Sequence, residues 1–274
     1  MPRFTTSDGL SLHYTDQGTG LPIICLAGLT RNGADFDYVA PFLSDVRMIR
    51  LDYRGRGQSQ WADDYLTYTI PLEGRDCVEL MNHLELQRAA ILGTSRGGLI
   101  AMGLAATVKD RLIGVALNDI GPELDPRGLE VIKNYIGRNP AQKTHAEAAA
   151  IRGAQMTGFA NVPDSRWKEE VQKLFTETPD GLQITYDPKL RDAVLEAGAQ
   201  PAPDLWPFFD TFDGLPLCAI RGANSDLLSA DTLAEMQRRR PDMIAAVVPD
   251  RAHIPFLDEP EAVAALRTWI EAMQ

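Results

Sequence analysis

The sequence predicts an α/β fold in which a mostly parallel central sheet is flanked by helices. Short apolar runs recur along the 274 residues, and they are almost continuously apolar rather than alternating. This pattern is typical of strands covered on both faces. Helical patterns lie between the runs, and strands that alternate with helices indicate crossover connections. Hydrophobic residues make up 45% of the chain, which is enough to build a sizeable core.

Seven segments have the character of strands. Residues 10–14 alternate between apolar and polar side chains, which predicts an antiparallel strand at an edge of the sheet. The other six runs are expected in the parallel part of the sheet, and they are 22–27, 46–51, 89–93, 113–118, 217–220 and 244–248.

Three helices are predicted around these strands. Residues 72–86 carry apolar side chains at helical spacing, and residues 99–108 are small and apolar. Residues 260–273 open with Pro260, and proline is favoured in the first turn of a helix.

A long stretch between two late strands breaks this alternation. We expect residues 1–121 and 214–274 to form one α/β core, with residues 122–213 inserted as a helical cap. The inserted stretch contains no good buried strand but has helical patterns at 129–136, 146–156 and 167–175.

The charge balance is acidic, because 27 Lys and Arg against 38 Asp and Glu give a formal net charge of −11. Nucleic acids and anionic membranes bind basic surfaces, so neither is expected as a partner. Residues 1–9 contain no apolar segment typical of a secretory signal. No run of about 18 apolar residues is present, so no membrane span is expected.

The three cysteines are Cys25, Cys77 and Cys218, and they cannot all pair with one another. Cys25 and Cys218 lie in apolar runs that are expected to be buried strands. We therefore expect reduced thiols in the core, which is typical of a cytoplasmic protein.

A G-x-S-x-G pattern at Gly93, Ser95 and Gly97 provides the candidate nucleophile. A serine at the tip of a sharp strand-to-helix turn has strained backbone geometry, and glycines two residues to either side let the chain pass closely. The following helix directs its N-terminal dipole and free N–H groups at the serine. A strand is predicted before Ser95 and a helix after it, which is the context that this motif requires.

Serine needs a general base, and His253 is the candidate. It follows the last apolar run, on a loop that can fold over the carboxyl end of the sheet, where Ser95 is expected. The other three histidines are interpreted as structural or solvated, and they are His13, His83 and His145.

The acid that orients the histidine should also follow a strand. Asp226 comes after the run 217–220, and the order Ser95, Asp226, His253 is the one that this architecture uses. Asp119, directly after the run 113–118, is the main alternative.

Two backbone N–H groups are candidates for an oxyanion hole. One belongs to Arg96, the residue after the nucleophile. The other belongs to Leu29, in the loop after the run 22–27. The alternative interpretation of this loop is an ordinary turn at the end of a strand.

Together these residues resemble the α/β-hydrolase superfamily, in its cap-bearing serine hydrolase and esterase branch, over essentially the whole chain. Residues 52–59, Asp-Tyr-Arg-Gly-Arg-Gly-Gln-Ser, are similar to a D-x-R-G-x-G-x-S loop of that branch. The resemblance implies that this loop is structural, so neither Asp52 nor Arg54 is expected to be catalytic. Residues 256–260 are similar to the family's histidine loop.

Two positions depart from the family pattern. Ala27-Gly28 stands where relatives usually have His-Gly, which leaves open what supports the oxyanion loop. Arg96 stands where relatives often have Met, Leu, Gln or Asn. Its cation could favour an anionic substrate or could pair with a neighbouring carboxylate.

The motifs predict a serine hydrolase that cleaves a small-molecule carboxylic ester, lactone or thioester through an acyl-enzyme. No cofactor is needed, and no metal-ligand spacing is present. The alternatives are a carbon–carbon bond hydrolase of the meta-cleavage type, an acyltransferase, and a non-catalytic ligand receptor on the same fold. Trp206 and Phe209, in an aromatic cluster at the end of the insertion, are the candidate substrate contacts.

Overall fold

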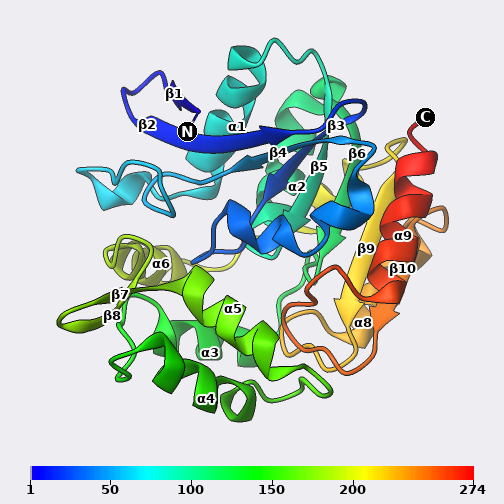
Figure 1. The fold of residues 1–274 in the computed structure, drawn as a ribbon. Helices are drawn as coiled ribbons and strands as arrows, with labels where there is room; N and C mark the ends of the chain where they lie inside the picture. Colours follow the sequence, from blue (N-terminus) through cyan, green and yellow to red (C-terminus); the bar gives the residue numbers. More distant parts are fainter. Residues whose placement is uncertain (1) are drawn as a thin grey trace.

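A computed structural model describes residues 2–274, so Met1 lies outside the described part of the chain (Figure 1). Its strands are β1 (Arg3–Thr5), β2 (Ser11–Gln17), β3 (Pro22–Leu26), β4 (Arg47–Leu51), β5 (Ala89–Thr94), β6 (Leu112–Asn118), β7 (Phe175–Thr178), β8 (Gly181–Ile184), β9 (Leu217–Gly222) and β10 (Ile244–Val248). Its α-helices are α1 (Ile70–His83), α2 (Arg96–Val108), α3 (Pro126–Tyr135), α4 (His145–Gln155), α5 (Asp164–Leu174), α6 (Leu190–Gly198), α7 (Trp206–Asp210), α8 (Ala230–Arg239) and α9 (Pro260–Glu271).

Eight of the strands form one sheet, in the order β1-β2-β4-β3-β5-β6-β9-β10. All neighbours from β4 to β10 in this order are parallel, whereas β2 is antiparallel to both β1 and β4. The predicted mostly parallel sheet is confirmed. The prediction that residues 10–14 form the edge is wrong, because β1 pairs outside β2. The three residues of β1 are too few to show an alternating pattern.

The two faces of the sheet are covered by different helices, as the near-continuous apolar strands predict. Along β3, Ile24 and Leu26 join the cluster that also contains residues of α1, α2 and α8. Their neighbours Ile23 and Cys25 join a second cluster, which contains residues of α9. Successive side chains of a strand point to opposite faces, so both sets become buried.

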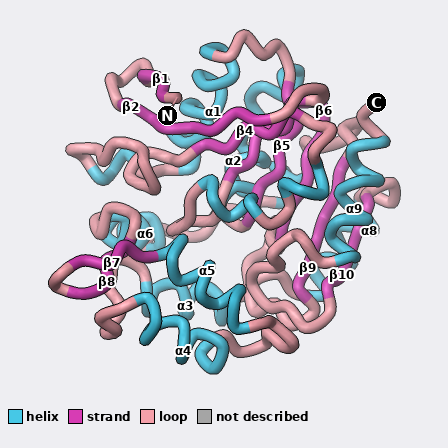
Figure 2. The backbone as a smooth tube through the Cα atoms, in the orientation of Figure 1, coloured by secondary structure: helices cyan, strands magenta, loops and turns pink. Residues whose placement is uncertain are grey.

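The chain between β6 and β9 is mostly helical, with one antiparallel hairpin, β7–β8. Figures 1 and 2 show α3, α4, α5 and this hairpin grouped together on one side of the molecule. The hairpin was not predicted, because its strands have four residues each and are only partly buried, which leaves a weak apolar signal.

All three cysteines are unpaired and buried. Burial in the core raises the pKa of each thiol to about 12, so each is a small apolar side chain rather than a reactive thiolate. Within residues 2–274, no helix has the length and apolar character needed to cross a membrane.

Candidate active site

Ser95 lies at the sharp turn between β5 and α2. Its φ of 50° is in the left-handed region that non-glycine residues rarely adopt. A Cβ on Gly97 would overlap the carbonyl group of Leu26, and a Cβ on Gly93 would lie 2.5 Å from the Gly97 carbonyl carbon. The two glycines are therefore required by close packing around the turn, which is the role expected for them.

His253 lies on the loop after β10 and reaches the serine. Its Nε2 is 3.0 Å from Ser95 Oγ, and its Nδ1 is 2.7 Å from Asp119 Oδ2. A carboxylate only accepts hydrogen bonds, so the proton of the neutral imidazole belongs on Nδ1. Nε2 then presents its lone pair to the serine hydroxyl, which is the arrangement of a nucleophile beside its general base.

The residue that contacts His253 is Asp119 and not Asp226, which corrects the predicted acid. Asp119 follows β6 directly and is fully buried. Its Oδ1 accepts a hydrogen bond from the Gly222 N–H (2.8 Å), and its Oδ2 accepts one from the Ser225 hydroxyl (2.6 Å). The loop after β9 thus supplies donors that hold the carboxylate, rather than the carboxylate itself.

The turn after β9 explains why Asp226 lies elsewhere. Ser225 points inward, and its Oγ accepts hydrogen bonds from the N–H groups of Leu227 (3.2 Å) and Leu228 (3.0 Å). Asp226 is the next residue, and its backbone carbonyl accepts from the Gly128 N–H on α3 (3.0 Å). Its side chain is half-buried and lines the cavity described below, without contacting His253.

The two predicted oxyanion donors lie near the serine. Arg96 is the first residue of α2, where a backbone N–H has no acceptor within the helix. Leu29 and Ser95 line the same cavity. Among residues 2–274, no acceptor is bonded to the N–H of either Leu29 or Arg96. Neither N–H group is therefore occupied by another backbone acceptor.

The 52–59 loop supports the loop after β3 that carries Leu29, a role that sequence reasoning missed. The Tyr53 hydroxyl donates to the Ala27 carbonyl (2.9 Å), and Arg56 Nε donates to the Leu29 carbonyl (3.1 Å). Both side chains are almost completely buried. These bonds fix the loop in a chain that has Ala27 where relatives usually have histidine. The motif predicted a structural loop but gave no signal of what it touches.

Asp52 is structural, as the resemblance implied. It accepts hydrogen bonds from the N–H groups of Gly33 (2.8 Å) and Gln58 (2.9 Å), and His13 Nδ1 lies 2.9 Å from its Oδ2. The other two histidines also contact protein groups. His83 contacts the Tyr14 hydroxyl, and His145 contacts the Phe175 carbonyl oxygen.

Arg96 pairs with a carboxylate, which settles the alternative left open by the sequence. Its Nε donates to Glu73 Oε2 (2.6 Å), and Arg56 Nη1 lies 2.9 Å from Glu73 Oε1. Burial alone would raise the pKa of Glu73, but the Arg56 and Arg96 guanidinium groups hold it below its usual value of 4.5. One buried carboxylate therefore joins the helix after the nucleophile to the arginine that holds the oxyanion loop.

Replacing Glu73 by glutamine is expected to lower the free energy of unfolding by about 3–5 kcal/mol, because two buried guanidinium groups lose their counterion. Urea denaturation at pH 7 measures this. Because the pKa of Glu73 is lowered on folding, its contribution is complete above the unfolded pKa and disappears as the pH falls through the folded value. The exposed control just after the same helix, Glu85→Gln, should cost less than about 1 kcal/mol, and a similar small loss for Glu73→Gln would contradict the prediction.

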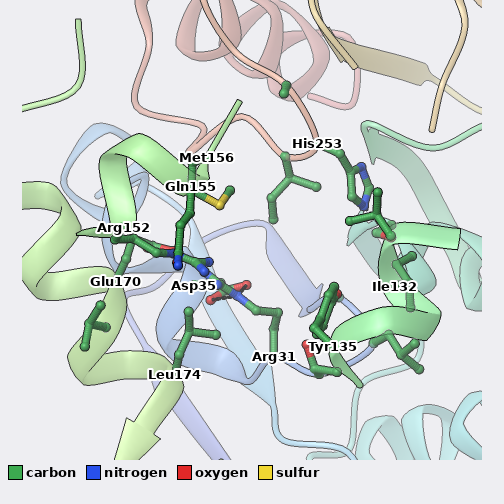
Figure 3. Close-up of a pocket in the computed structure, with 18 of the residues that line it drawn as sticks. Arg31, Asp35, Ile132, Tyr135, Arg152, Gln155, Met156, Glu170, Leu174 and His253 are labelled. Carbon is green, nitrogen blue, oxygen red and sulfur yellow. Dashed lines mark hydrogen bonds and ion pairs between the residues drawn. The ribbon is translucent and has the colours of Figure 1, made fainter. Parts of the chain in front are cut away.

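A cavity of about 590 Å³ opens at Ser95 and His253. Much of its wall comes from α3, α4 and α5, so the helical chain between β6 and β9 encloses part of the space in front of the serine (Figure 3). Its apolar and aromatic lining, which is typical of a small-molecule site, includes Ile132, Tyr135, Met156, Phe159, Trp167, Val171, Leu174 and Phe256.

Trp206 and Phe209 do not line this cavity, so the prediction that they contact substrate is wrong. Phe209 is fully buried in the core cluster beside the sheet, with its ring centroid 5.9 Å from that of Phe212. Trp206 packs under Arg239, whose guanidinium carbon lies 4.1 Å from the indole centroid. The short helix α7 packs against α2, which takes both aromatic rings away from the serine.

The cavity has a charged side, formed by α4, α5 and the loop after β3. Arg31 donates through Nε to Asp35 (2.8 Å) and through Nη2 to Glu170 (2.7 Å). Burial tends to raise the pKa of Glu170, but the Arg31 guanidinium brings it below its usual range. Figure 3 shows this group, together with Arg152 and Gln155, across the cavity from His253.

Comparison with known proteins identifies the family. A sequence model of the Alpha/beta hydrolase family matches residues 23–266. A 3-hydroxybutyrate-oligomer hydrolase from Cupriavidus necator is 37% identical over 251 residues, which cover 88% of this chain and 85% of that protein. A 2-(acetamidomethylene)succinate hydrolase from Mesorhizobium japonicum is 25% identical over 266 residues, covering 96% and 92% of the two chains.

The crystal structure of an alpha/beta hydrolase from Novosphingobium aromaticivorans superposes with a TM-score of 0.90 at 35% identity, covering 98% of this chain and 97% of that one. The family model and these relatives span most of the present sequence. The chain therefore belongs to the Alpha/beta hydrolase family.

Proposed function

We propose that this hydrolase cleaves a carboxylic ester of a small molecule through an acyl-enzyme on Ser95. The observation that carries the proposal is the continuous path from Ser95 Oγ to His253 Nε2 (3.0 Å) and from His253 Nδ1 to Asp119 Oδ2 (2.7 Å). The relative that hydrolyses 3-hydroxybutyrate oligomers supports an ester in particular, because hydroxy acids are joined to one another through ester bonds.

The proposed reaction begins when His253 Nε2 takes the proton of Ser95 as Oγ attacks the ester carbonyl. The oxyanion that forms accepts hydrogen bonds from the N–H groups of Leu29 and Arg96. Asp119 holds the ring in position and stabilises its positive charge. When the intermediate collapses, the ester C–O bond breaks, and His253 returns the proton to the departing alcohol.

Hydrolysis of the acyl-enzyme repeats these steps with water as the nucleophile. His253 removes a proton from the water, the hydroxide attacks the acyl carbonyl, and the same two N–H groups hold the oxyanion. Collapse breaks the bond to Ser95 Oγ, which takes the proton back from His253, and the carboxylic acid leaves. No step needs a group from outside the chain other than water and the ester.

Residues 122–213 are proposed to act as a cap on the α/β core. Helices α3, α4 and α5 of this segment line the cavity together with Ser95 and His253. A cap in this position shields the oxyanion from bulk water, where hydrogen bonds to charge are weaker. It also sets the length and polarity of the substrates that can reach the serine.

A fluorophosphonate probe tests the proposal, because it phosphonylates only an activated serine. We expect the intact protein to gain the mass of one probe group, and the proteolytic peptide that contains Ser95 to carry it. Wild-type protein should also release p-nitrophenol from p-nitrophenyl butyrate. Protein that is neither labelled nor active on this ester would overturn the proposal.

A further inference from the structure

Arg152, on α4, differs from the other arginines around the cavity because one of its side-chain nitrogens is buried without a partner, whereas Arg31 is paired and Arg138 is exposed to solvent. Its side chain lines the cavity, and its Nε is buried without any hydrogen-bond acceptor. Among residues 2–274, no carboxylate oxygen lies within 4.0 Å of its guanidinium nitrogens. A buried cationic nitrogen without an acceptor is costly, so the unpartnered Nε requires an explanation.

Arg31 provides the contrast, because it faces the same side of the cavity with its charge already matched. Asp35 and Glu170 both bind its guanidinium, at 2.8 Å and 2.7 Å. Glu170 Oε1 accepts no hydrogen bond, but it lies more than 4.0 Å from the Arg152 nitrogens, so the second cation of the group remains without a direct partner. Figure 3 shows the Arg152 side chain directed towards this group at the cavity wall.

The protein groups around Arg152 disfavour its charge. Burial lowers its pKa first, and the neighbouring Arg31 cation lowers it further, while Glu170 acts in the opposite direction. An anion that entered the cavity would relieve both effects, because it would supply the missing acceptor beside two cations. Guanidinium groups bind carboxylates with two parallel hydrogen bonds, which suits this task.

We infer that Arg152 binds a carboxylate of the substrate, so that the ester cleaved at Ser95 belongs to a molecule whose far end is an organic acid. The inference rests on the proposed function, since it assigns the substrate class of the same cavity. Ile132, Tyr135 and Leu174 also line the cavity and provide apolar wall against which the carbon chain can pack. Arg152 is therefore a specificity-determining residue and takes no part in the bond-breaking steps.

The test compares two substrates that differ only in this charge. One is the linear dimer of 3-hydroxybutyrate, which has one ester and a free carboxylate, and the other is the same dimer with its carboxylate converted to a carboxamide. Wild-type protein should show a higher kcat/KM for the acid. Arg152→Gln should lower the ratio of the acid to the amide by about 10- to 100-fold, the range expected for a lost hydrogen bond to a charged group.

Three further variants make the comparison specific. Arg152→Lys keeps the charge but not the two-pronged geometry, so it should restore part of the ratio. Lys168→Gln removes an exposed cation from α5, away from the cavity lining, and should leave the ratio unchanged. If Arg138→Gln, at an exposed cavity residue, abolishes the preference while Arg152→Gln does not, the inference is overturned.

The melting temperature distinguishes a role of Arg152 in substrate recognition from a structural role. Because the Arg152 guanidinium makes no hydrogen bond to the protein, Arg152→Gln should leave the melting temperature unchanged or slightly raised. A clear decrease would mean that Arg152 serves mainly as a counterion to Glu170, and would overturn the inference.

Binding gives a readout that does not depend on turnover. Calorimetric titration of the inactive Ser95→Ala protein should show tighter binding of the acid than of the amide, and Arg152→Gln in that background should remove the difference. Equal binding of the two compounds to Ser95→Ala would overturn the inference, even where probe labelling of Ser95 upholds the serine hydrolase itself.

Discussion

Replacing Asp119 by asparagine is expected to lower kcat for ester hydrolysis about 10⁴-fold, with the fold intact. Asp119 Oδ2 accepts from both His253 Nδ1 and the Ser225 hydroxyl, and Oδ1 accepts from the Gly222 N–H. An asparagine that kept its oxygen towards Gly222 would turn its NH₂ group towards His253. The ring proton would then move to Nε2, and the histidine could no longer accept the proton of Ser95.

Asp226→Asn is the matched control, because it makes the same chemical change at the residue that the sequence favoured. Asp226 lines the cavity without touching His253, so this variant should retain kcat within a few-fold of wild type. Initial rates with p-nitrophenyl butyrate measure both variants, and circular dichroism checks that each is folded. If Asp226→Asn were the slower of the two, the observed triad geometry would not be the catalytic one.

Ser95→Ala is expected to lower kcat by about 10⁶-fold, the largest effect in the chain, because no nucleophile remains to form the acyl-enzyme. The side chain is almost fully buried, so removing one oxygen changes little else. The protein should lose all labelling by the fluorophosphonate probe. Activity close to that of wild type would show that water, and not the serine, attacks the ester.

The double variant Ser95→Ala/Asp119→Asn tests whether the residues act as one unit. The role of Asp119 is to keep His253 ready for the serine proton, so that role ends once the serine hydroxyl is gone. We therefore expect the double variant to be no more than a few-fold slower than Ser95→Ala alone. Independent, multiplying effects would mean that Asp119 contributes to the reaction by another route.

The parallel strands and the turn at Ser95 could be predicted because each depends on residues that are neighbours in the sequence. The parallel strands all begin and end within a few residues of the predicted runs, and they are 22–26, 47–51, 89–94, 112–118, 217–222 and 244–248. Their apolar character is continuous because both faces of the sheet are covered. Ser95 was identifiable for a similar reason, since the strained turn between β5 and α2 demands glycines at fixed positions.

The acid was not determined by the local sequence. Asp119 and Asp226 both follow strands, and β6 and β9 are neighbours in the sheet, so either carboxylate could be brought near His253. The choice depends on the turn after β9, in which Ser225 points inward and hydrogen-bonds to Asp119. That hydrogen bond joins residues 106 apart in the sequence, and no periodicity or spacing in the sequence indicates that the two residues meet.

Contiguous residues with a period or a fixed spacing encode the α/β fold, the nucleophile turn and the histidine loop, so all three could be predicted. The folded chain was needed to show which carboxylate contacts His253, that Glu73 neutralises Arg96, and that Arg152 has a buried Nε without an acceptor. Pairing between charges could not be predicted because it depends on which distant elements pack together. A sequence records which residues carry charge, whereas packing decides which of those charges meet.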